Sequence, residues 1–201
     1  MKSVLISIQP KWCELIASGK KTVEVRKTKP KLETPFKVYI YCTKNKEKLI
    51  EVIHDGDEVY GFTHKGKPNF IKTFTKDWSV YGAFKGGKVI GEFVCNKIEQ
   101  GHILWVKEHP EYYDRVEEKT QLTYRQMFDY FGESGVGCFW HISNLVIYDK
   151  PRELSEFYTL KKCNSCKSGY ESSACIYDED CKVPAPITRP PQSWCYVEGT
   201  E

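Results

Sequence analysis

Apolar and polar residues alternate along several short stretches of the chain, with the period of a half-buried β-strand. We expect strands over residues 4–8, 22–26, 37–43, 89–98 and 138–148, and shorter ones over residues 58–62 and 69–74. Residues 193–197 are apolar enough to add one more strand near the C-terminus. The pattern therefore predicts a sheet built from many short strands.

Helical spacing appears at three places between these strands. Trp12, Leu15 and Ile16 form an apolar stripe in a helix over residues 10–18, which begins at a proline and ends at a glycine. Thr123 and Gln126 have the spacing of a capping box, which predicts a helix over residues 123–131. Residues 44–54 predict a charged helix, whereas residues 101–118 show no firm periodicity.

One turn and the strand after it carry a dense group of polar residues. Alternation places Thr22, Glu24 and Arg26 on one face of this strand, opposite two valines. A carboxylate and a guanidinium on one strand face can bind each other, as a surface ion pair, or a polar ligand. Lys21 can join them only if it belongs to the turn, before the alternation begins.

The spacing Gly19-x-Lys21-x-x-Glu24-x-Arg26, directly after a short helix, resembles the signature of the ASCH domain, a small β-barrel family related to the PUA RNA-binding domains. The likeness continues at residues 88–93, 138–143 and 149–151, so it covers roughly residues 2–157. Together with the alternating strands, it implies an α+β fold. We expect a PUA-like, mostly antiparallel β-barrel of five to seven strands, flanked by helices at residues 10–18 and 123–131.

The composition of the chain changes near residue 159. We therefore expect an ASCH domain at residues 1–158, followed by a Cys-rich appendage and C-terminal tail at residues 159–201. Residues 161–181 hold few aliphatic side chains and cannot build a hydrophobic core of their own. The prolines at residues 183–191 predict an extended tail.

Charge and hydropathy limit the classes of partner and the cellular location that we expect. The formal net charge of +3 is compatible with a nucleic-acid partner but does not require one. The N-terminal apolar run is too short for a signal peptide, and no run approaches the ~20 apolar residues that span a membrane. We expect a cytoplasmic protein with no membrane partner.

The resemblance implies a module that binds RNA or a modified nucleotide in a polar cleft. The cleft would be built on the signature residues, which would also be the catalytic ones if the protein were an enzyme: Lys21, Glu24 and Arg26. The further ligand-binding candidates are Thr22 beside them and the wall residues Trp12, Tyr41, Trp140 and His141.

Two other functions stay open. An ASCH-like amidohydrolase removes the acetyl group of N4-acetylcytidine with a threonine nucleophile, a lysine and a distant glutamate. Lys21 and Arg26 match that pattern, but Glu24 stands at the threonine position, and Thr22 could replace it only with a shifted substrate. The chain could thus be a hydrolase of RNA or of an acylated nucleoside. The other alternative is a protein-interaction module that docks through its appendage.

The appendage carries a candidate zinc site. Cys163 and Cys166 have the spacing of a metal knuckle, and Cys175 and Cys181 follow at looser spacing. Four thiolates around Zn²⁺ would leave no open position, so the zinc would be structural. The alternatives are two disulfides, which a cytosolic setting disfavours, or free thiols, and Cys195 could replace one ligand.

Metal analysis tests the zinc site. Protein purified without added zinc should hold about one equivalent of Zn²⁺, because a closed thiolate site binds the ion tightly. A Cys163→Ser, Cys166→Ser variant should lose the metal. Freely titratable thiols at all four positions, with less than about half an equivalent of zinc, would contradict the site.

Overall fold

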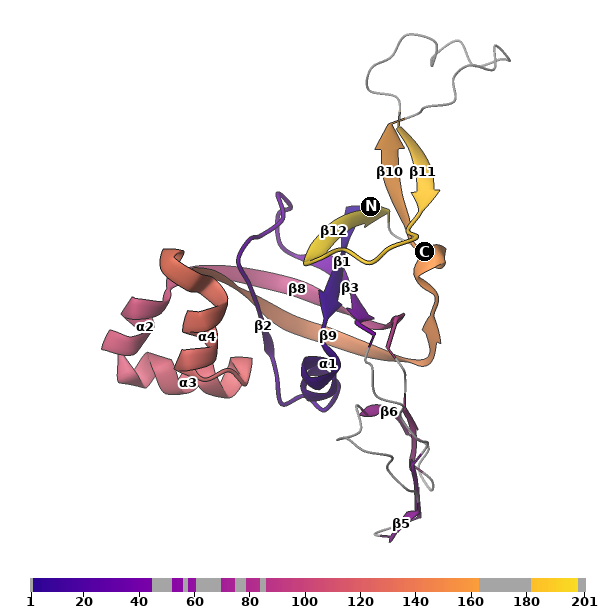
Figure 1. The fold of residues 1–201 in the computed structure, drawn as a ribbon, viewed down its shortest axis with the longest axis horizontal. Helices are drawn as coiled ribbons and strands as arrows, with labels where there is room; N and C mark the ends of the chain where they lie inside the picture. The colour runs from indigo at the N-terminus through magenta and orange to yellow at the C-terminus, as the bar shows by residue number, and fades with distance from the viewer. Residues whose placement is uncertain are drawn as a thin grey trace.

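A six-stranded sheet forms the centre of the molecule. The computed structural model describes residues 2–44, 52–55, 58–60, 70–74, 79–83, 86–162 and 182–198. The strand order is β12-β1-β3-β8-β9-β2, and each neighbouring pair is antiparallel except β1 with β3 (Figure 1). The strands are β1 (Lys2–Ile8), β2 (Val23–Arg26), β3 (Phe36–Cys42), β8 (Lys88–His102), β9 (Val136–Arg152) and β12 (Trp194–Glu198).

This sheet does not close into the barrel that we expected. Among the described strands, β12 and β2 occupy the two ends of the order and do not pair with each other. β2 ends at Arg26, and the loop that follows does not pair with β12 as a strand. Two hydrogen bonds connect the following loop to β12 instead: Trp194 Nε1 donates to Thr28 Oγ1 at 3.1 Å, and the Lys31 amide donates to the Tyr196 hydroxyl at 2.7 Å.

The two longest strands extend beyond their predicted ends. We expected residues 149–151 to end β9. The strand instead continues through them, because Arg152 pairs with Val89 of β8. A register shift falls at Gly91, where an added Cβ would clash with the carbonyl oxygen of Val146. The glycine is therefore required by the close approach of the two backbones.

Two helices lie where the pattern predicts them. They are α1 (Pro10–Ala17) and α4 (Tyr124–Phe131), and both bonds of the capping box between Thr123 and Gln126 are formed. Two more helices, α2 (Ile103–Glu108) and α3 (Pro110–Thr120), fill the stretch without firm periodicity. Pro110 at the start of α3 was the available sequence signal.

Two smaller sheets complete the described strands. The first has the order β5-β4-β7-β6, with β4 (Val52–Asp55), β5 (Glu58–Tyr60), β6 (Phe70–Phe74) and β7 (Ser79–Ala83). The helix expected over residues 44–54 is therefore wrong at its end, where β4 begins. The second is the hairpin of β10 (Tyr158–Lys162) and β11 (Lys182–Pro186), so residues 183–186 are a paired strand and not an extended tail.

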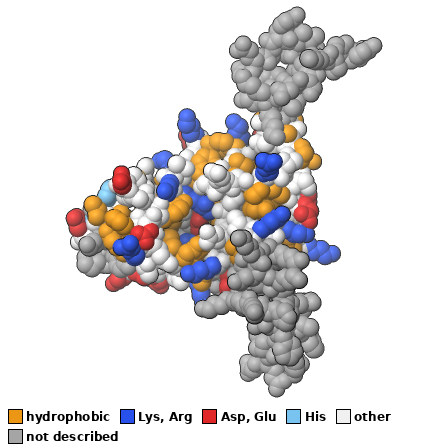
Figure 2. Space-filling view, viewed as in Figure 1, with side chains coloured by type: hydrophobic (Ala, Val, Ile, Leu, Met, Phe, Trp, Pro, Cys, Tyr) orange, Lys and Arg blue, Asp and Glu red, His pale blue; other side chains and the backbone are white. Residues whose placement is uncertain are grey.

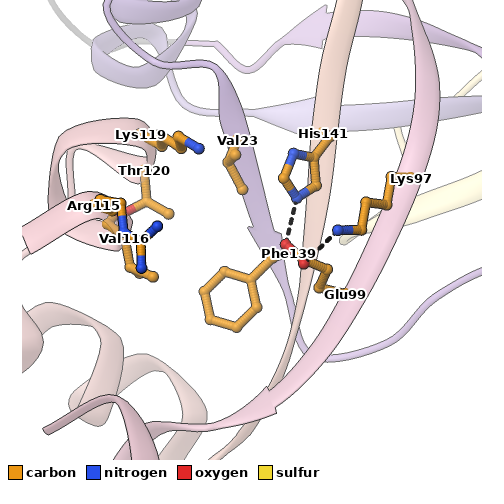
Figure 3. A pocket seen from close by; sticks show the side chains of 9 residues that line it. All are labelled: Val23, Lys97, Glu99, Arg115, Val116, Lys119, Thr120, Phe139 and His141. Carbon is orange, nitrogen blue, oxygen red and sulfur yellow. Dashed lines mark hydrogen bonds and ion pairs between the residues drawn. The ribbon is translucent and has the colours of Figure 1, made fainter. Parts of the chain in front are cut away.

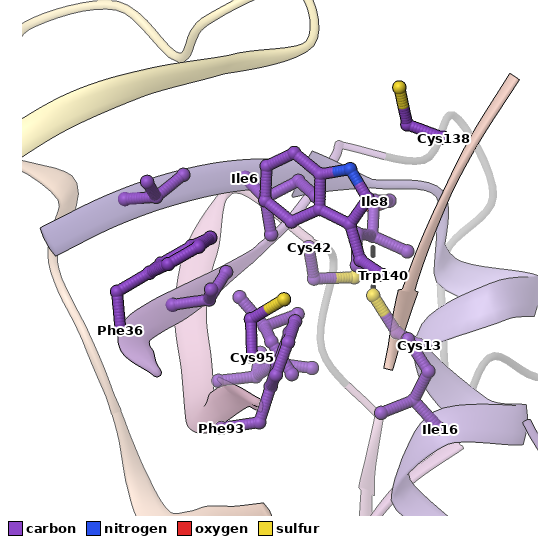
Figure 4. Packing of buried hydrophobic residues seen from close by; sticks show 14 residues of the cluster. Ile6, Ile8, Cys13, Ile16, Phe36, Cys42, Phe93, Cys95, Cys138 and Trp140 are labelled. Atoms are coloured by element: carbon purple, nitrogen blue, oxygen red, sulfur yellow. Dashed lines mark hydrogen bonds between the residues drawn. The ribbon is translucent and has the colours of Figure 1, made fainter. Parts of the chain in front are cut away.

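Buried apolar residues form three clusters around the main sheet. One packs α1 against the main sheet and includes Trp140 and the cysteines Cys13, Cys42, Cys95 and Cys138 (Figure 4). A second, on the other face of β1 and β3, includes Tyr39, Tyr41 and Phe157. The third packs α2, α3 and α4 against β2 and β9. Within the described residues, the helices are too short or too polar to cross a membrane.

Candidate functional site

Glu24 lies between two buried cations. Its Oε2 atom is 3.4 Å from Lys21 Nζ, and its Oε1 atom is 2.9 Å from Arg26 Nη2. The exposed fractions are 2% for Lys21, 6% for Glu24 and 7% for Arg26. Side chains of these types are almost never buried this deeply unless they are paired. We call these three residues the triad.

The backbone explains how the triad assembles. β2 begins at Val23, so Lys21 still belongs to the turn after α1 and can reach the side of the strand that Glu24 faces. Lys21 Nζ donates to the Thr120 carbonyl at 2.6 Å, and Arg26 Nη2 donates to the Ser7 carbonyl at 2.6 Å. The triad is thus held by the end of α3 on one side and by β1 on the other.

The triad lines a cavity of about 770 Å³, which we call the triad cavity. Elements from four parts of the chain enclose it. The other polar and aromatic lining residues used below are Ser7 and Gln9 from the end of β1, Trp12 of α1, Gln126, Asp129 and Tyr130 of α4, and residues 190–193 of the C-terminal segment.

Burial sets the protonation behaviour of this cavity. It lowers the pKa of Lys21 below the usual 10.5, although the carboxylate of Glu24 opposes the shift. Burial likewise raises the pKa of Tyr130.

With Lys21 charged, the triad carries one net positive charge. Arg26 Nε is a buried donor with no hydrogen-bond partner among the described residues. The wall can therefore hold a phosphate or a polarised carbonyl.

The family is shown by a sequence comparison. The model of the ASCH domain matches residues 6–136, which is more than half of the chain and includes the whole triad. The chain belongs to the ASCH domain family. No match to a curated protein was found.

Solved structures of an ASCH protein from Zymomonas mobilis share the fold. That protein has 18% sequence identity to this chain. Its crystal structure matches with a TM-score of 0.54 over 98% of this chain and 87% of the other. A variant of the same protein with tyrosine replaced by phenylalanine is 17% identical, with a TM-score of 0.54 and coverages of 98% and 91%. At this identity the likeness concerns the fold alone.

The predicted site residues of this ASCH domain divide into two groups. Lys21, Glu24, Arg26 and Trp12 all line the triad cavity. The others lie elsewhere: Thr22 is exposed and outside the cavity lining, Tyr41 and Trp140 are buried in hydrophobic clusters, and His141 lines a second pocket.

Sequence reasoning missed the residues from α4 and the C-terminal segment. Asp129 and Tyr130 follow Gln126 at i+3 and i+4 on the capped helix, so both lie on the same side of the helix as Gln126, and this was a usable signal. No local pattern relates residues 190–193 to the triad, which lies more than 160 positions away. That contact depends on the pairing of β12 with β1.

The predicted zinc ligands Cys163, Cys166, Cys175 and Cys181 lie outside the described residues. In the described part of the chain, no group of three or more His, Cys, Asp or Glu side chains could hold a metal ion. The zinc site remains a prediction from the spacing.

Replacing Glu24 by Gln should destabilise the protein strongly. The change keeps the shape of the side chain but leaves the charges of Lys21 and Arg26 buried without an anion, which costs about 3 kcal/mol or more. Urea denaturation measures the loss. Arg125→Gln is the control, because it breaks an ion pair whose side chains are 81% and 55% exposed and which should be worth less than about 1 kcal/mol. Equal, small losses in both variants would contradict the account of the triad.

Proposed function

We propose that this ASCH domain binds RNA or a modified nucleotide in the triad cavity. The observation that carries the proposal is the burial of one carboxylate and two cations together on the wall of a large cavity. As a stabilising device this would be a poor choice, because apolar residues of similar size are often as stabilising as a buried ion pair. ASCH domains are generally RNA-binding modules, which supports the same conclusion.

The dimensions of the cavity suit a nucleotide. Its volume of about 770 Å³ lies within the range of roughly 300–1,000 Å³ that small-molecule sites occupy. Trp12 and Tyr130 line it from two different helices and offer rings on which a base can stack. Lys11 Nζ lies 4.6 Å from the centroid of the Trp12 ring, which adds a cation beside this surface.

The polar groups match the edges and the phosphates of a nucleotide. Lys21 and Arg26 offer N–H donors to a phosphate or a base carbonyl, and Glu24 has lone pairs left to accept from an exocyclic amino group. Lys and Arg side chains are spread over the face seen in Figure 2 and not gathered in one patch. With a net charge of only +3, the chain is better suited to a cleft that holds one or a few nucleotides than to a broad phosphate-binding surface.

The nucleophile that the sequence offered to the hydrolase alternatives, Thr22, does not lie in the triad cavity. Thr22 is exposed. Ser7 does line it, but its hydroxyl donates to the Pro191 carbonyl at 2.6 Å, and no base is bonded to it among the described contacts. We therefore propose binding and not turnover. The interaction alternative rested on the appendage, where residues 163–181 lie outside the described part of the chain.

Replacing Lys21 by Met should weaken binding of short RNAs or modified nucleosides by about tenfold or more, because it removes a buried, charge-assisted donor. Fluorescence anisotropy over a panel of labelled RNAs and competing nucleosides measures the effect. Wild-type affinity should also fall as the pH rises through the pKa of Lys21, which burial places below 10.5, since the ammonium is lost there. The Lys21→Met variant should lack this alkaline transition.

Lys20→Met is the matched control for this experiment, because Lys20 is the exposed neighbour of Lys21 and does not line the cavity. Its affinity should stay within a few fold of wild type. The same mixtures are analysed for products. A product that forms with wild type and not with Lys21→Met would replace binding by hydrolysis as the function. No binding to any member of the panel would refute both.

A further inference from the structure

The loop between β2 and β3 begins at the edge of the triad cavity. Arg26 is the last residue of β2 and lines the cavity, and Lys27 follows it directly. Lys27 Nζ lies 5.4 Å from the ring centroid of Tyr130, which lines the same cavity from α4. Arg26 and the backbone of Lys27 also oppose the rise in the pKa of Tyr130 that burial causes. Tyr130 therefore connects the wall of the cavity to the start of this loop.

Residues 27–31, which we call the basic loop, alternate between outward and inward positions. The lysines of the loop are all exposed: Lys27, Lys29 and Lys31. Between them, Pro30 is buried, and Thr28 Oγ1 accepts a hydrogen bond from Trp194 Nε1 at 3.1 Å. A residue before proline favours extended backbone, in which alternate side chains share one side and their Cα atoms are roughly 7 Å apart. The lysines therefore lie together on the side of the loop that faces solvent.

Tertiary contacts hold the basic loop in place. The hydrogen bond between Thr28 and Trp194 attaches its start to β12. The Lys31 amide attaches its end to the same strand, because it donates to the Tyr196 hydroxyl at 2.7 Å. Leu32, the next residue, packs against the cluster that lies between α1 and the main sheet. The lysines thus extend from a fixed backbone, which lowers the entropy cost of binding a ligand.

The positive charge of the basic loop is not balanced by neighbouring carboxylates. In the part of the chain that the structure describes, no carboxylate forms an ion pair with any of the three lysines. Asp129, which precedes Tyr130, pairs with Arg125 at 3.0 Å, and Glu24 pairs with the two cations of the triad. Glu33 is the single acidic residue of residues 27–33, so this stretch carries a net charge of +2.

From this arrangement we infer that the basic loop binds the phosphates next to the nucleotide in the triad cavity, so that the ligand is a single strand of RNA. The inference rests on the proposed function, which places one nucleotide in the cavity. A lysine binds a phosphate as a point charge, and the separation of neighbouring lysines is close to that of neighbouring phosphates in an extended strand. An unpaired strand also lets a base leave its stack and enter a cavity, where Tyr130 offers a ring at the boundary with the loop.

Binding of nucleosides inside and outside a strand tests the inference. The probes are the nucleosides of the panel used for Lys21→Met, each alone and as the central residue of an oligouridylate of about eight nucleotides. Wild type should bind the strand more tightly than the nucleoside alone. The double variant Lys29→Gln, Lys31→Gln should bind the strand about tenfold more weakly at low salt. The slope of log affinity against log salt concentration should fall in magnitude by about 1.4, because two phosphate contacts are lost.

Calorimetry with the nucleosides alone and a matched variant complete the experiment. The Lys29→Gln, Lys31→Gln variant should bind a nucleoside within about twofold of wild type, since neither lysine lines the cavity. The control is Lys20→Gln, Lys150→Gln, which removes the same charge from exposed positions outside both pockets and should keep the strand affinity of wild type.

The outcomes separate the inference from the proposed function. Equal losses in the two double variants, or a nucleoside that binds alone as tightly as within its strand, would overturn the inference and leave the proposed function standing. A matching loss of nucleoside affinity in the Lys29→Gln, Lys31→Gln variant would also overturn it, because these lysines would then act on the cavity itself. Binding of neither kind of probe would refute the proposed function and the inference with it.

Discussion

The ion pairs of Glu24 with Lys21 and Arg26 are the constraint on which the arrangement of this domain depends. Three charges are buried at one place, and the two cations make further hydrogen bonds to parts of the chain outside β2 and its turn. Lys21 donates to the end of α3, and Arg26 donates to β1. Arg26 Nη1 also lies 3.5 Å from Ser193 Oγ in the C-terminal segment. Parts of the chain that are distant in sequence are thereby fixed around one cavity.

The two faces of β2 then serve different purposes. One face presents the triad to a large cavity with aromatic walls, and the other packs two valines against the helices α2 to α4. Because the helices must cover those valines, the end of α3 is brought next to the turn that carries Lys21, and the Thr22 amide bonds the Lys119 carbonyl at 2.9 Å. The second pocket, which His141 lines, is a consequence of the same packing, since it lies where α3 meets β9 (Figure 3).

Local patterns predicted the elements better than their contacts. Alternation and capping predicted α1, α4 and the strands of the main sheet. The signature residues Lys21, Glu24 and Arg26 do meet, because Lys21 belongs to the turn before the strand. Tyr41 and Trp140 were chosen as cleft walls, but a strand buried on both faces offers no sign of which cluster it enters. The C-terminal wall and the open edges of the sheet depend on long-range pairing, which no local spacing encodes.

Cross-linking to RNA is the most direct test of the central claim that the triad cavity is the ligand site. The protein is irradiated with short RNAs that contain 4-thiouridine, and the attached peptides are identified by mass spectrometry. Because Trp12 and Tyr130 line the cavity, the account predicts cross-links at these two residues, lost when an unlabelled RNA competes. Cross-links confined to the exposed basic loop at residues 27–31, with neither aromatic residue attached, would contradict it.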